Sequence, residues 1–145
     1  MAETKTKKVM GWKKCTVVMG ETTYNDIKEG TTSLSVEEGQ ETEATIEGGE
    51  AEGRHKDPDK YVLTIERRIG SEEVKPGFIE DAGDVEVKPS RKGARTVKLT
   101  GVSQHISVKY DSTDGAVAIY KWKTKGQTDE DGNLADISIG TVPLV

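Results

Sequence analysis

The clearest alternation of apolar and polar residues lies between residues 102 and 125. In 102–110 apolar side chains recur at alternate positions, which is the period of a strand with one buried face. The pair Asp114-Gly115 then suits a turn that needs positive φ. Residues 116–122 alternate again, and the first half of this run is apolar on both faces. We therefore predict a hairpin whose second strand lies centrally in a sheet and is covered on both sides.

Shorter alternating runs occupy much of the remaining chain, and we expect strands within 12–19, 61–69, 84–88, 94–100 and 134–145. Residues 31–38 and 41–47 alternate on either side of Gly39-Gln40, which indicates a second hairpin with a polar outer face. Residues 48–60 hold three Gly, one Pro and no apolar residue larger than Ala, which predicts a 13-residue loop. Residues 1–10 are polar and are expected to form a flexible N-terminal arm.

Nine or ten strands, with turn signals every 8 to 12 residues or so, are typical of a β-sandwich or barrel. We predict an all-β fold, a single domain over residues 1–145, built as a β-sandwich or partly closed barrel of antiparallel strands. At most one short helix, over 77–82, is expected. Ile, Leu, Val and Phe make up 29 of the 145 residues, so the core should be thin. A thin core suits a subunit that is stabilised by its neighbours in an assembly.

Charge is segregated along the chain, which carries a net charge of −5. Seven Glu and no Lys or Arg lie between residues 37 and 52, whereas residues 5–14 hold five Lys. This pattern favours either simple solubility or head-to-tail contacts between copies. The Glu-rich stretch either blocks unwanted strand pairing or faces negative cargo without binding it. Net acidity argues against tight nucleic-acid binding.

Residues that could carry chemistry are few and do not form a recognised pattern. His55 and His105 are the two histidines, and with Cys15 they give no metal-ligand spacing and no nucleophile with a base. The acidic run 129–133 begins like a calcium loop, but Ser138 stands where the bidentate Glu would be needed. Trp122 shares a strand face with small apolar residues, so we expect it in the core rather than on a base-stacking surface. We predict no enzymatic activity, cofactor or metal.

No apolar run reaches the roughly 20 residues of a membrane helix, and no signal peptide is evident. We expect a soluble protein made in the host cytoplasm, with no membrane partner.

Three stretches suggest a family resemblance: TTSLSVEEGQETEATIEGG from residue 31, DPDKYVLTIERR from residue 57, and VKLTGVSQHISVKYDSTDGAVAIYKWKTKG from residue 97. In strand order and texture they resemble the tail-tube proteins of long-tailed bacteriophages and contractile injection systems. That family implies a small acidic β-sandwich or barrel, often with a helix on its side. It also implies hexameric rings that stack into a hollow tube for DNA.

The resemblance implies a structural virion protein of the tail, whose partners are further copies of itself and other tail proteins, with DNA passing unbound. It also implies that loop 48–60 reaches the adjacent ring, so deleting 49–57 should leave a folded monomer that forms no tubes. The alternatives are a capsid decoration or baseplate module, and a ligand- or carbohydrate-binding β-sandwich. The expected subunit-interface residues are Lys7, Lys8, Trp12, Glu50, Glu52, Arg54, His55, Lys56 and Asp57.

Overall fold

The computed structural model describes residues 12, 15–45, 47–49, 51–70, 73–90 and 92–142, and only the backbone at 45, 51, 52, 54 and 55. These residues form ten strands and no helix, which confirms the all-β prediction. The predicted N-terminal arm, residues 1–10, lies outside the described residues. The strands are β1 (Cys15–Met19), β2 (Thr22–Tyr24), β3 (Ser33–Glu37), β4 (Glu41–Thr45), β5 (Ala51–Lys56), β6 (Lys60–Arg68), β7 (Gly77–Pro89), β8 (Arg95–Asp111), β9 (Gly115–Lys123) and β10 (Ile137–Thr141).

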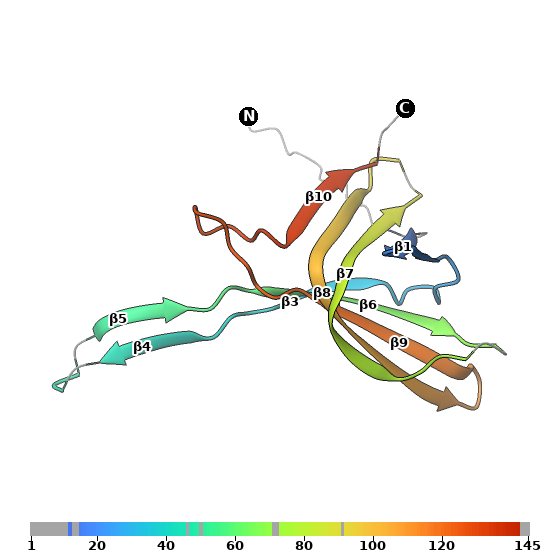
Figure 1. The fold of residues 1–145 in the computed structure, drawn as a ribbon, viewed down its shortest axis with the longest axis horizontal. Helices are drawn as coiled ribbons and strands as arrows, with labels where there is room; N and C mark the ends of the chain where they lie inside the picture. The colour runs from blue at the N-terminus through green and yellow to red at the C-terminus, as the bar shows by residue number, and fades with distance from the viewer. Residues whose placement is uncertain are drawn as a thin grey trace, which may run out of the picture.

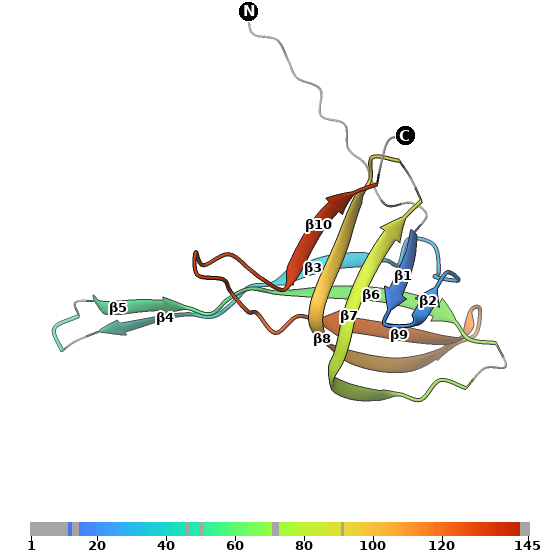
Figure 2. The ribbon, with the colours of Figure 1, turned by 45° about the horizontal axis from the view of Figure 1, so that its top comes forward.

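Eight strands form one antiparallel sheet that divides into two layers at β8 (Figure 2). One edge of β8 pairs with β7, and its other edge pairs first with β10 and then with β9. The upper layer consists of β2, β1, residues 85–89 of β7, residues 95–99 of β8, and β10. The lower layer consists of residues 77–79 of β7, residues 103–111 of β8, β9, β6 and β3. The result is a half-barrel, within the predicted class of sandwich or partly closed barrel.

Two long strands, β7 and β8, pass from one layer to the other by bending at glycines. Gly83 and Gly101 have φ of 110° and 63°, a region that glycine adopts without steric cost. The amide N–H of Gly101 also donates to Asp84 Oδ1 at 3.1 Å, which ties the two bends together. The separate short strands expected over 84–88, 94–100 and 102–110 are therefore parts of two continuous strands. The helix expected over 77–82 was wrong, because Phe78 and Ile79 pair with β8.

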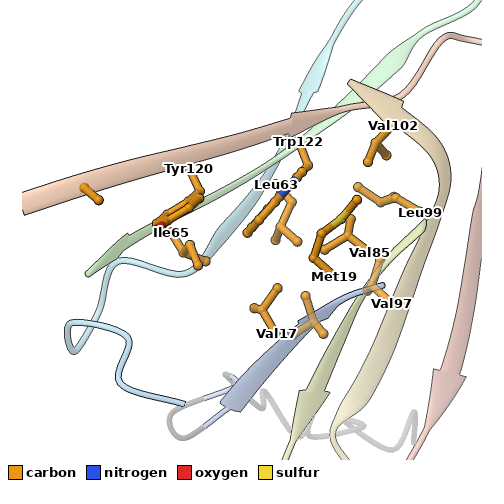
Figure 3. Close-up of a cluster of buried hydrophobic side chains, with 12 residues drawn as sticks. Val17, Met19, Leu63, Ile65, Val85, Val97, Leu99, Val102, Tyr120 and Trp122 are labelled. Atoms are coloured by element: carbon orange, nitrogen blue, oxygen red, sulfur yellow. The ribbon is translucent and has the colours of Figure 1, made fainter. Parts of the chain in front are cut away.

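The core lies between the two layers (Figure 3). Val17, Val85 and Leu99 enter it from the upper layer and are 0% exposed. Leu63 and Trp122 enter it from the lower layer, and the buried indole Nε1 donates to Gln104 Oε1 at 3.0 Å. The predicted core position of Trp122 is confirmed. The predicted 102–125 hairpin is confirmed too, because β9 pairs with β8 and β6, and Val117 and Ala118 on its opposite faces are both 0% exposed.

The hairpin predicted about Gly39-Gln40 was wrong. β3 pairs with β6, β4 pairs with β5, and the register runs on from Glu37↔Lys60 to Glu41↔Lys56. Gly39 is required by a close approach of the two chains, because a Cβ there would lie 1.7 Å from the carbonyl oxygen of Asp57. Residues 33–68 thus form one long ribbon with a short break at its middle.

The loop predicted over residues 48–60 was also wrong, since it contains β5 and the start of β6. The chain reverses instead at a tight turn in which Gly48 and Gly49 have φ of 112° and 86°. Residues 41–56, here called the arm, extend from the body as a two-stranded hairpin (Figure 1). Among the described residues, no helix has the length and apolar character needed to span a membrane.

Candidate assembly surfaces

The arm is polar and solvent-exposed along the part whose side chains are described. Glu41, Thr42, Glu43 and Ala44 are all exposed, although their strand alternates as if one face were to be covered. An isolated two-stranded hairpin is at best marginally stable in water. The arm therefore either depends on its base for its shape or gains a partner.

The base of the arm is held by hydrogen bonds at the break in the ribbon. The amide N–H of Gly39 donates to Asp59 Oδ1 at 2.9 Å, and that of Asp57 donates to the carbonyl of Gln40 at 3.0 Å. The Gly39 N–H, with smaller help from Lys56 Nζ at 3.5 Å, holds the pKa of Asp59 below its ordinary value. These contacts fix the direction in which the arm leaves the body.

The predicted interface residues divide between the arm and the body. Glu52, Arg54, His55 and Lys56 belong to β5, and Asp57 lies at the base, so the ribbon brings these five positions together. Lys7, Lys8 and Glu50 lie outside the described residues. Trp12 instead packs against the edge of the core, and its Nε1 donates to the carbonyl of Arg95 at 2.8 Å. Whether these residues form a subunit interface stays a prediction.

Two edges of the lower layer are open within the described part of the chain. No described strand pairs with the outer edge of β3, nor with the edge of residues 77–82 of β7 that faces away from β8. Phe78 and Ile79 on that part of β7 are 64% and 52% exposed, and Val36 on β3 is 48% exposed. Open strand edges with apolar side chains readily pair with another chain. The sequence pattern could not reveal these surfaces, because alternation marks an apolar face without saying what covers it.

A buried arginine closes one side of the core. Arg67 Nε and Nη2 donate to both oxygens of Asp26 at 2.7 and 2.9 Å, and Nη1 donates to Tyr120 Oη at 2.9 Å. The guanidinium also lies 5.0 Å from the ring centroid of Tyr24, and the Tyr24 ring packs at a tilt against that of Tyr120. The hydrogen bond from Arg67 lowers the pKa of Asp26 and raises that of Arg67. This cluster fastens residues 24–27 over the core, and sequence reasoning did not find it.

A second ion cluster ties that segment to the β8–β9 turn. Asp114 accepts from Lys28 Nζ at 2.7 Å and from Arg68 Nε at 3.0 Å, and these two hydrogen bonds lower its pKa. Asp111 Oδ1 accepts from the N–H groups of Thr113 and Asp114, which forms the turn before Gly115 at φ 72°. Both ion clusters are accounted for by their role in holding the fold together and need no catalytic or binding role.

The residues considered for chemistry lie apart from one another. His105 is exposed on β8, and Cys15 is a half-buried free thiol at the edge of the core. No group of three metal-ligating side chains occurs among the residues that the structure describes. Asp129 Oδ1 accepts the N–H groups of Asp131 and Asn133, so the acidic run forms a hydrogen-bonded turn.

Comparison with known proteins gives a likeness of fold. No family model matches the chain, and no curated protein sequence matches it. Among solved structures, a chain in the cryo-EM structure of the anti-feeding prophage cap, the cap that terminates the tube, superposes with a TM-score of 0.54. The two chains are 10% identical, and the match covers 97% of each. At this identity the likeness shows a shared all-β architecture over nearly the whole length of both chains.

Proposed function

We propose that this protein is a structural, self-assembling subunit of a phage-type tail or injection tube. The observation that carries the proposal is the ribbon 33–68, half of which builds the lower layer while the other half leaves the body as an exposed arm. A monomeric domain has little use for a projecting hairpin whose described side chains are exposed, whereas a subunit can use it to reach a neighbour. The fold shared with a chain of the anti-feeding prophage cap supports the same class.

The finer proposal is a tail-tube subunit that forms stacked hexameric rings around a DNA conduit in the virion tail. The two open edges of the lower layer support ring formation, because different edges of identical copies can pair head to tail and close by rotation. The net charge of −5 supports a conduit in which DNA passes without being held, since like charges oppose the phosphate contacts that drive binding.

A second candidate is a protein that terminates a tube, and the solved structure with the similar fold favours it. The two candidates differ in stacking. A tube subunit joins ring to ring without limit, whereas a terminating protein forms one ring that stops growth.

Light scattering behind a sizing column, over a concentration series, tests the proposal, with negative-stain imaging of the largest fraction. Tubes of uniform diameter support the tail-tube subunit, and single rings that do not stack support the terminating protein. A strict monomer at every concentration, alone and with purified tail assemblies, would reject both. A glycan-binding screen would then test the carbohydrate-binding alternative.

A further inference from the structure

Opposite charges are concentrated in two separate parts of this chain. Residues 37–52 hold seven Glu and no Lys or Arg. Residues 87–110 hold six Lys or Arg and no Asp or Glu. In the fold the first stretch covers residues 41–52 of the arm and its approach. The rest of the arm carries Arg54 and Lys56, which lie opposite Glu43 and Glu41, so five Glu against two cations leave the arm net acidic. The second stretch runs from the end of β7 through the β7–β8 turn and along almost all of β8.

The described cations near the β7–β8 turn form what we call the cationic end: Lys88, Lys92, Arg95 and Lys98. All four are exposed. The strands beside them, β1 and β10, contain no acidic residue. Glu86 lies opposite Lys98 in the strand register without an ion pair to it, and nearby Asp84 already accepts the N–H of Gly101.

The cationic end differs from the lower layer in how its charges are used. In the lower layer Arg68, Lys109 and Lys123 each pair with a carboxylate of the same chain, at 3.0, 3.3 and 2.6 Å. No ion pair joins any of the four cations of the cationic end to a carboxylate in the described part of the chain. The same holds for Glu38, Glu41 and Glu47 of the arm and its approach.

The charges of the arm and of the cationic end cannot pair with one another within a single molecule. Figures 1 and 2 both show the arm extending away from the body and from the β7–β8 turn. A contact between them requires a second copy, and in the head-to-tail arrangement of the proposed ring it is heterologous. A contact of this kind repeats from copy to copy.

We propose that the cationic end is the docking surface for the acidic arm of a second copy of this chain. The contact is electrostatic, with Glu38, Glu41 and Glu47 of one copy facing Lys88, Lys92, Arg95 and Lys98 of the next. This inference deepens the proposed function, on which it rests, by naming which surface receives the arm. Charge complementarity of this kind sets orientation and excludes wrong pairings.

A charge-exchange experiment tests the contact. An arm variant carries Glu38→Lys, Glu41→Lys and Glu47→Lys, and an end variant carries Lys88→Glu, Lys92→Glu and Lys98→Glu. Every substituted residue is exposed, so both variants should fold, and circular dichroism and thermal melting check this. Lys75→Glu with Lys121→Glu is the matched control, since both are exposed cations outside the cationic end. Sedimentation equilibrium measures association of each protein alone and of the equimolar mixture.

The arm variant alone presents positive charge at both surfaces, and the end variant alone presents negative charge at both. We expect each to associate at least tenfold more weakly than the unchanged protein, the mixture to recover, and the control to associate normally. Undiminished association of either variant, or a mixture that does not recover, would overturn the contact while leaving the proposed function in place. Absence of association in the unchanged protein at every concentration, with or without tail assemblies, would reject the proposed function together with the contact.

Discussion

One continuous ribbon, residues 33–68, contributes to the body and forms the arm of this protein, yet its two parts are stabilised differently. In the body, β3 and β6 place Leu34, Leu63 and Ile65 against a core that the upper layer covers. In the arm, the same register continues through β4 and β5, but the described side chains stay in water. The difference shows that strand pairing is enough to continue the ribbon into the arm. Burial of apolar side chains is what makes the body stable without a partner.

The largest expected effect comes from the body. Trp122→Ala removes a fully buried indole and leaves a cavity between the layers, so we expect the free energy of unfolding to fall by about 3–5 kcal/mol. For a domain with a thin core this is a large share of the total. Thr42→Ala in the arm is the matched change and should stay within about 0.5 kcal/mol. Urea titration of both variants measures the contrast, and equal losses would show that the arm belongs to the same cooperative unit.

Gly39→Ala acts where the two regions join. A Cβ at this position overlaps the Asp57 carbonyl, so the break in the ribbon must open or shift. We expect a loss of about 1–3 kcal/mol together with a change in the arm's direction. Hydrogen exchange should speed up at residues 38–40 and at Asp57 and Asp59, while the core amides at Leu63 and Ile65 stay protected. Uniformly faster exchange across the sheet would contradict this local assignment.

The Arg67 cluster supplies a pH dependence that belongs to the body alone. Because Arg67 lowers the folded pKa of Asp26, this contribution is fully present above the unfolded pKa of about 3.9 and is lost as pH falls through the folded value. Asp26→Asn should cost about 1 kcal/mol at pH 7, since it leaves the buried guanidinium without its carboxylate while solvent already screens the Asp26 side, which is 51% exposed. It should also flatten the stability profile below about pH 4. If the free energy of unfolding of the variant fell with acid as steeply as that of the unchanged protein, protonation of Asp26 would not be linked to folding.

The sequence predicted the body better than the arm. The 102–125 hairpin was predictable because its partners are adjacent in sequence and one face is buried. β5 was missed because the only apolar residue in its sequence, AEGRHK, is one alanine, so the alternation that marks a strand is absent. Gly39 resembled a turn residue, but its need arises from Asp57, which only the folded ribbon brings near. The pairing of β10 with β8, and the Asp26–Arg67 contact, likewise depend on distant residues, whereas alternation fixes faces and not partners.

The smallest expected effect on stability is the most informative. Replacing residues 41–56 with Asn-Gly keeps the Gln40–Asp57 pair, which a two-residue turn can close. The shortened chain loses no described core residue, so its free energy of unfolding should stay within about 0.5 kcal/mol. Deleting only 49–57 would instead remove β5 and leave β4 unpaired. For the 41–56 replacement we therefore expect thermal melting to show an unchanged melting temperature and sedimentation to show that assembly is abolished. A large drop in melting temperature would place the arm in the folding unit, and normal assembly would move the interface to the open edges of β3 and β7.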